Sequence, residues 1–423
     1  MANSLIKRYQ MLDFCGDDFY CPQKIHSERI FSLNTSLIKD GDIIYLMTRE
    51  LRLEDNWGIL FAFEKARELH KKLRVILPLS LLQISQRQKD FLQKFLPALK
   101  DDFARNNISF EILEGNIEFS LSSVGMVVCD FDPVLDLKQK LLGVECACFE
   151  VDSHNIIPAR FASGKQEFSA ATFRPKVYKN LCEFWSEFPS AFAVKKNVAR
   201  GVLSDFVENK LDFYAVQKND PTKDFVSDLS KYLHFGLISA QRVALEVGKS
   251  TATRENKESF LEELIVRKEL SDNFCLYNKS YLSFDAAPAW VKENFENHRE
   301  DIRHYVYDIE TFENAQTHEE LWNACQRQLL SEGKIHGYLR MYWAKKILEW
   351  TQSPEEAVKI AVYLNDTYAL DGNDPNGYVG ILWAIAGVHD RPFFEREVFG
   401  KIRYMNENGC RRKFDTAAYI KNY

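Results

Sequence analysis

The sequence has 423 residues, a net charge of −6, 46% apolar residues and 27% charged residues. A chain of this length forms two or three domains, and its composition is that of a soluble globular protein. The acidic balance excludes a globally basic nucleic-acid binder but leaves local basic patches open. The longest apolar runs, such as GILWAIAGV, are too short to span a membrane, and MANSLIKRYQMLDFCGDD lacks the apolar stretch of a signal peptide.

Nine cysteines are scattered along the chain without a C-x-x-C pair, and only Cys146 and Cys148 lie close together. This pattern predicts reduced thiols, with no disulfide framework and no zinc site. We therefore expect a cytoplasmic protein, or a nuclear one if the source is eukaryotic.

The first part of the chain alternates short strand patterns with helical patterns. We predict strands at 42–47, 73–79, 108–113, 125–131 and 145–151, and helices at 55–72, 86–104 and 134–142. Continuous apolar strands separated by helices indicate a parallel sheet that is covered on both faces. Residues 1–152 are therefore predicted to form an α/β, Rossmann-like domain.

The rest of the chain loses its strand signals. Residues 153–175 show no clear period and are interpreted as an inter-domain linker, and residues 176–423 as an all-α domain. We predict helices at 200–212, 237–248, 256–275, 319–331, 337–351, 354–364 and 376–387.

Several familiar motifs are incomplete. GKST at 248–251 resembles the end of a phosphate loop, but Val243 stands where the first glycine is required. No G-x-G-x-x-G follows a strand, so the α/β domain is not expected to hold a dinucleotide in the Rossmann manner. HEELW at 318–322 lacks the second histidine of H-E-x-x-H, and no metal site is expected.

Three patterns in the helical half remain open on sequence alone. Glu263 and Arg267 are spaced to pair across one helical turn, on the surface or in a site. The polar loop and apolar helix at 363–390 suit either a pocket for a flat polar ligand or a turn rich in helix caps. Trp343 and Trp350 lie seven residues apart on one helix face. These two rings either pack in the core or have a functional role on that face.

The segment 391–414 is basic in an acidic protein. It carries seven Arg or Lys residues against three Glu residues, a local charge of 7 − 3 = +4, interleaved with Phe and Tyr. This pattern fits a phosphate-contacting surface or a solvated face.

These segments closely resemble class II cyclobutane pyrimidine dimer photolyases, which are flavin-dependent, light-driven DNA repair lyases. The matching stretches are LRLEDNWGIL (51–60), KNDPTKDFVSDLSKYLHFGLISAQRVALEV (218–247), SFLEELIVRKELSDNFCLYN (259–278), GKIHGYLRMYWAKKILEWT (333–351), LDGNDPNGYVGILWAIAGVHD (370–390) and VFGKIRYMNENGCRRKFDTAAYI (398–420). The resemblance covers nearly the whole helical half and covers the N-terminal half thinly. It implies FAD bound in a U shape within the helical domain. It also implies an α/β domain that serves as a platform for a second, antenna chromophore, a deazaflavin or a folate.

The resemblance assigns roles residue by residue. The implied cofactor-binding residues are Tyr214, Ser227, Leu229, Ser230, Arg267, Arg340, Asn365, Asp371 and Asn373, with Asn365 facing flavin N5 and Arg340 paired with Asp371. Glu263 looks like the residue that hydrogen-bonds the dimer, and Met341 and Trp383 look like the walls of its pocket. Trp343, Trp322 and Trp350 match the electron relay that reduces the flavin. Lys218 and Asn219 match a motif near the bound lesion, although the family more often has Arg at the position of Lys218. The expected DNA contacts of the basic segment are Arg391, Lys401, Arg403, Arg411 and Arg412.

The implied activity is that of a deoxyribodipyrimidine photolyase acting as a monomer on UV-damaged DNA. The dimer flips out of the duplex, and excited reduced FAD lends it one electron while the cyclobutane ring splits. The alternatives are a cryptochrome-like photoreceptor without repair activity and a helical nucleic-acid-binding protein without flavin. The short stretch after Phe414 favours the repair enzyme over the photoreceptor, which usually carries an extended tail.

Overall fold

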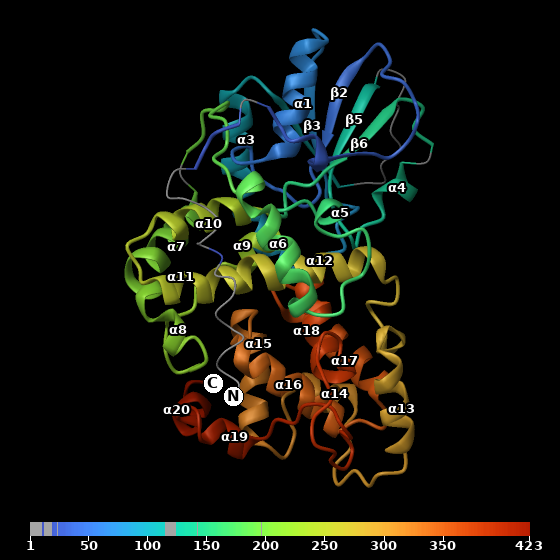
Figure 1. The fold of residues 1–423 in the computed structure, drawn as a ribbon, viewed down its shortest axis with the longest axis vertical. Coiled ribbons are helices and arrows are strands. Elements are labelled where there is room, and N and C mark those ends of the chain that lie inside the picture. The colour runs from blue at the N-terminus through green and yellow to red at the C-terminus, as the bar shows by residue number, and fades with distance from the viewer. Residues whose placement is uncertain (1–10, 12–18, 23, 115–123, 142, 196) are drawn as a thin grey trace.

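The computed structural model describes residues 11, 19–22, 24–114, 124–141, 143–195 and 197–423. Figure 1 shows two parts, a sheet flanked by helices and a larger part built of helices. The α/β plus all-α architecture expected from the sequence is confirmed. None of the described helices is long and apolar enough to cross a membrane.

The sheet has six strands in the order β1-β6-β5-β2-β3-β4. The strands are β1 (Ile30–Ser32), β2 (Asp42–Leu46), β3 (Leu73–Pro78), β4 (Ser109–Leu113), β5 (Val124–Asp130) and β6 (Ala147–Val151). Neighbouring strands run parallel, except that β1 is antiparallel to β6. The five predicted strands are confirmed. β1 lies outside the prediction because it is a partly exposed edge strand of three residues, too short for a periodic signal.

Alternate residues of the central strands pack into different cores. Ile43 and Tyr45 of β2 join the larger core, whereas Ile44 and Leu46 join a smaller one on the opposite face. Both faces of the sheet are therefore buried, which is why these strands read as continuous apolar runs.

The helices of this part are α1 (Trp57–Glu68), α2 (Gln86–Gln93), α3 (Leu96–Arg105) and α4 (Leu137–Lys140). The single helix predicted at 86–104 is wrong, since the chain breaks between α2 and α3. Pro97 occupies the second position of α3, where its missing N–H costs no helical hydrogen bond. No disulfide joins the cysteines in the described part of the chain.

The predicted linker is more ordered than its sequence suggests. It contains the short helix α5 (Ala159–Ala162), and α6 (Ala170–Phe184) begins within it. Residues 153–157 are buried. Their backbone is held by the guanidinium of Arg29, which donates to the carbonyl oxygens of Asn155 and Ile156 at 2.9 and 2.7 Å. The domain boundaries at 152 and 176 stay predictions.

The helical part begins with α6 and extends to the C-terminus. Its remaining helices are α7 (Val198–Asp205), α8 (Tyr214–Gln217), α9 (Ser230–His234), α10 (Ala240–Lys249), α11 (Arg254–Leu261), α12 (Lys268–Tyr277), α13 (Ala289–Asn297), α14 (Ile309–Glu313), α15 (Glu320–Glu332), α16 (Gly337–Glu349), α17 (Pro354–Tyr368), α18 (Pro375–Ala386), α19 (Glu407–Arg411) and α20 (Thr416–Asn422). Every predicted helix of this half is found, although π-helical turns interrupt the two at 200–212 and 256–275.

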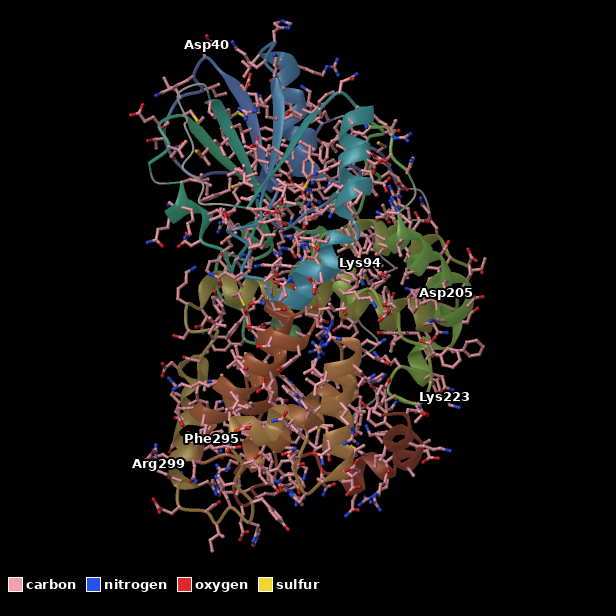
Figure 2. The ribbon with its side chains drawn as sticks, turned by 180° about the vertical axis from the view of Figure 1, so that it is seen from behind. Asp40, Lys94, Asp205, Lys223, Phe295 and Arg299 are labelled. Carbon is pink, nitrogen blue, oxygen red and sulfur yellow. The ribbon has the colours of Figure 1, made fainter. Side chains whose placement is uncertain are left out.

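The two parts meet along α12 and α2. Arg49, which follows β2, forms a fully buried two-pronged ion pair with Asp272 of α12 at 3.0 and 2.9 Å. Figure 2 shows Lys94, next to the end of α2, at the level of this junction. A buried pair of this geometry fixes how the two parts sit relative to each other, because breaking it would leave an uncompensated charge.

Candidate functional site

One chain of rings is formed by three tryptophans: Trp322 of α15, Trp343 of α16 and Trp350, which directly follows α16. The indoles of Trp343 and Trp322 are stacked, with centroids 6.3 Å apart and planes 5° apart. Trp322 and Trp350 meet edge to face at 6.0 Å. All three are buried. Trp322 of α15 therefore lies between Trp343 and Trp350, which the helical spacing of α16 alone did not reveal.

At its outer end, Trp350, the chain of tryptophan rings contacts further aromatic rings. His318 and Tyr307 contact Trp350 with centroids at 4.9 and 5.8 Å, and Tyr305 stacks on His318 at 3.6 Å. Tyr305 is 47% exposed, so the rings reach the surface. No part in an electron relay was predicted for these three residues, since they lie in connections before α14 and α15 that have no helical period.

At its inner end, Trp343, the chain of tryptophan rings lies near an ion pair. Arg340 is one helical turn before Trp343 on α16, and its guanidinium donates to Asp371 at 2.9 Å. The side chains of this pair are 23% and 14% exposed. The predicted pairing of Arg340 with Asp371 is thus present, and it places a fixed charge pair beside the start of the ring chain.

Asn365 is held by a carboxylate. Its Nδ2 donates to Asp366 at 2.9 Å, and Asp366 also accepts from the backbone N–H of Asn373 and from the hydroxyl of Tyr378. Burial raises the pKa of Asp366, while these donors lower it. Because the carboxylate accepts only, the Asn365 amide must turn its nitrogen toward Asp366 and its oxygen away.

A helix of the α/β part organises the same loop. Gln88 of α2 is fully buried, donates to the carbonyl of Gly372 at 3.0 Å and accepts from Asn373 at 3.2 Å. Its neighbour Arg87 donates to Leu330 at the end of α15 at 2.6 Å. No local signal could have shown these contacts, since Gln88 and Gly372 are 284 residues apart.

The segment predicted to bind the flavin phosphates, 227–230, contains a residue with a left-handed backbone conformation. Asp228 has φ of 55°, and its carboxylate is bound by Lys231 at 2.6 Å and Lys334 at 3.0 Å. Ser227 and Ser230 flank it, whereas Tyr214 and Leu229 are buried in the core. Two lysines beside two hydroxyls can bind a pyrophosphate. Neither lysine is among the residues predicted to bind the cofactor.

The predicted pair between Glu263 and Arg267 is wrong. Residues Glu262–Arg267 form a π-helical turn, which aligns residues five apart and not four. Arg267 therefore pairs with Glu262 at 3.4 Å, and Glu262 also binds Arg174. Glu263 is exposed and instead accepts from Lys218 at 3.1 Å, which brings together two residues that the resemblance places near the lesion.

A cavity of about 550 Å³ opens beside α16 and α18. Four predicted site residues line it, namely Asn219, Met341, Trp383 and Arg403. The other predicted DNA contacts of the basic segment, Arg391, Lys401, Arg411 and Arg412, are exposed but do not line it. The structure thus separates one cavity from a surrounding basic surface.

The residues present fit a flavin. Side chains that suit a flat polar ring (Arg340, Asp371 and Asn365) and cations that suit a pyrophosphate lie on neighbouring elements. Gly377 of α18 leaves room for Asn365, since a Cβ there would stand 2.9 Å from its Nδ2. No group of three or more metal-ligating side chains occurs in the part of the chain that the structure describes.

Comparison with known proteins shows which family and which relatives this chain resembles. The family described as DNA photolyase matches residues 43–193. The deoxyribodipyrimidine photo-lyase of Potorous tridactylus is 39% identical, covering 89% of this chain and 80% of that protein. The corresponding protein of Oryza sativa subsp. japonica is 41% identical, covering 90% of this chain and 87% of that protein.

Solved structures share the fold at low identity. A class III photolyase from Agrobacterium tumefaciens superposes with a TM-score of 0.70 at 18% identity, covering 92% of this chain and 87% of that one. A Synechocystis cryptochrome gives a TM-score of 0.70 at 14% identity, covering 92% of this chain and 89% of that one. With this fold, and with such identities to its relatives over most of its length, the chain belongs to the DNA photolyase family.

Proposed function

We propose that this protein binds FAD and uses light to split cyclobutane pyrimidine dimers in DNA. The observation that carries the proposal is the continuous chain of Trp343, Trp322 and Trp350, whose inner end lies one helical turn from the Arg340–Asp371 pair. A chain of buried indoles joining a charged ligand site to the surface suits one-electron transfer, and relatives named deoxyribodipyrimidine photo-lyase support the substrate.

On the cofactor side, Ser227, Ser230, Lys231 and Lys334 hold the phosphates, and Arg340, Asp371 and Asn365 hold the flavin ring. When bound and reduced, FAD supplies the electron that opens the cyclobutane ring under light. The carboxylate of Asp366 holds the Asn365 amide by its nitrogen, which would leave the amide oxygen available to the flavin. Asn365 itself is buried, which limits the access of water to this side of the ring.

On the DNA side, Met341 and Trp383 form the walls against which the flipped dimer packs, and Glu263 bonds its bases. Lys218 holds the Glu263 carboxylate in place at 3.1 Å. Arg391, Lys401, Arg403, Arg411 and Arg412 contact phosphates and set the register without reading the lesion.

The direct test is an absorbance spectrum of purified protein followed by blue-light repair of a dimer-containing oligonucleotide. We expect about one non-covalent FAD per chain and loss of dimers only under light. A folded, colourless protein that takes up no added FAD would refute the proposal. A flavoprotein that repairs nothing would favour the cryptochrome-like alternative.

We further propose that the α/β part is the platform for any second chromophore, a deazaflavin or a folate. A cavity of about 80 Å³, lined by residues that include Thr48, Arg49 and Asp132, lies at the carboxyl ends of β2 and β5, where the strand order reverses. Its volume encloses only part of such a ring system, because sites that bury drug-sized ligands measure roughly 300–1,000 Å³. Chromatography of the cofactors released on denaturation identifies any second chromophore.

We also propose that the protein acts as a monomer in the compartment that holds the DNA, the cytoplasm or, in a eukaryote, the nucleus. Sedimentation of the purified protein with and without lesion DNA tests the monomer.

Reversing charges on the basic surface should weaken all DNA binding. In Lys401→Glu with Arg412→Glu, affinity for lesion and undamaged duplexes should fall together, because phosphate contacts carry no lesion information. Each phosphate interaction that is removed should reduce the slope of log affinity against log salt by about 0.9. Binding titrations at several salt concentrations measure both effects. Lys100→Glu is the control, since Lys100 is exposed on α3 in the α/β part, away from α13, α19 and α20 (Figure 1). A loss confined to lesion DNA would assign these cations to the cavity.

Removing the charge of Glu263 should reduce repair and spare the flavin. Glu263→Gln keeps the shape and one acceptor, so FAD content should persist. Repair per absorbed photon should fall, and lesion binding should weaken by the roughly 1–3 kcal/mol of a charged hydrogen bond. The neighbour Glu262 binds Arg174 and Arg267. Glu262→Gln should therefore lower the melting temperature with little change in repair per photon. Equal repair yields in wild type and Glu263→Gln would return Glu263 to the role of a partner for Lys218.

A further inference from the structure

Lys345 is a buried lysine that the proposed chemistry does not use. Its side chain is 0% exposed, and its Nζ donates to the carbonyl of Ala384 at 2.6 Å. Among the described residues no carboxylate forms an ion pair with it. Burying an ammonium group without such a partner is costly, which calls for a functional reason.

The position of Lys345 connects it to the lesion cavity. Tyr338 and Met341, which line the cavity, lie seven and four residues before it on α16, so all three share one face of the helix. Its Nζ lies 5.3 Å from the ring centroid of Trp383, and Trp383 is a wall of the same cavity. Lys345 thus stands directly behind the cavity wall.

The cavity itself is positively charged. Arg396, Arg403 and Lys413 line it, and no Asp or Glu is found among its described lining residues. Arg403 also lies 5.3 Å from the Trp383 ring, so two cations lie close to this indole. Asp390 pairs with Arg403 at 3.1 Å and also acts on Lys345, but it lies outside the described lining of the cavity.

We propose that Lys345 is a positioning residue of the lesion cavity, whose ammonium group stabilises the negative charge that enters the cavity with the substrate. This role rests on the proposed function. The charge comes first from the DNA phosphates and then from the single electron that the dimer takes from reduced FAD and returns after its ring has split. A cation acts over the distance across one indole ring, since the buried surroundings screen it far less than water does.

The charge state of Lys345 should respond to DNA. Burial lowers the pKa of Lys345 to about 7; Asp390 raises it and Arg403 lowers it, and these are the charged groups that face it. The free protein therefore loses this charge as the pH rises through neutrality. Phosphates brought near the cavity favour the charged form and raise the pKa in the complex, so DNA binding takes up a proton above about pH 7.

The pH effect has a definite sign. Below about pH 7 the lysine is charged with or without DNA, and affinity is constant. Above that pH the free protein is neutral while the complex is charged, so affinity falls until the pH passes the higher pKa of the complex. A shift of one pKa unit corresponds to about a tenfold fall in affinity.

The experiment measures the affinity of the FAD-loaded protein for a dimer-containing duplex between about pH 6 and pH 9 at constant ionic strength. Wild type should lose roughly tenfold across this range. Lys345→Met should bind with the weak, high-pH affinity throughout, with a flat profile. Calorimetry in two buffers of different ionisation enthalpy should show proton uptake above pH 7 in wild type only.

Two further variants separate charge from structure. Lys346, the next residue, is also buried, but Glu319 and Glu349 overcome the effect of burial and raise its pKa. Lys346→Met should lower the melting temperature and keep the wild-type pH profile. Asp390→Asn should move the midpoint of the profile to lower pH, and it tests the proposal even if Lys345→Met does not fold.

A wild-type affinity that does not change with pH would overturn the proposal, as would an unchanged profile in Lys345→Met or Asp390→Asn. Failure to bind lesion DNA at every pH would refute the proposed function itself, and with it this role.

Discussion

In Trp343→Phe, we expect light-driven reduction of oxidised FAD by an external thiol to fall by roughly two orders of magnitude or more, which needs only about 3 kcal/mol of added barrier. Trp343 is the inner ring of the chain and stacks directly on Trp322. A phenyl ring is much harder to oxidise than an indole, so the chain would be cut at its first step. Trp350→Phe should slow the same reaction less, because the first two indoles remain.

The same variants distinguish a relay from packing. Trp343 donates to Gln326 at 3.0 Å, so its replacement leaves a buried acceptor unpaired and should cost about 1–3 kcal/mol of stability. For Trp350→Phe the loss should be on the order of 1 kcal/mol. Repair by enzyme whose FAD has been chemically reduced should survive in both, since the repair electron does not pass through these rings. Melting temperature, FAD content and photoreduction rate, all measured on both variants, distinguish the relay from core packing. Normal photoreduction in both variants would end the relay hypothesis.

Breaking the Arg340–Asp371 ion pair, which we propose to lie beside the flavin, should release the cofactor. In Asp371→Asn, the dissociation constant for FAD should rise about 10- to 100-fold, because removing one partner of a mostly buried charged hydrogen bond costs roughly 1–3 kcal/mol. The change leaves Arg340 without its carboxylate partner at the inner end of the ring chain. Fluorescence titration of the apoprotein with FAD measures the constant directly.

A second ion pair provides the matched control. Arg411 and Glu407 pair at 2.7 Å, but their side chains are 60% and 26% exposed. Glu407→Gln should leave FAD affinity and stability nearly unchanged, as exposed pairs contribute little. If Asp371→Asn bound FAD as tightly as this control, the Arg340–Asp371 pair would lie outside the flavin site.

The sequence by itself determined the types of the elements and the family. Apolar runs such as DIIYL and the helical periods of α15 to α18 are local properties, because a strand or helix shows its period in its own residues. The long motifs likewise placed Arg340, Asp371 and the three tryptophans in one expected site. Where the local signal was weak, prediction failed, as in the short edge strand β1 and in the break before α3.

Only the tertiary structure decided which side chains meet. Trp322 lies between Trp343 and Trp350 because α15 packs against α16, and Gln88 reaches Gly372 because the two parts of the molecule dock along α2. The π-helical turn at Glu262–Arg267 replaced the expected Glu263–Arg267 pair, since it shifts the alignment of side chains by one residue. The buried Lys345 behind Trp383 is visible only in three dimensions as well. Such contacts depend on the packing of distant segments, and the spacing of residues along one helix carries no information about what lies across from it.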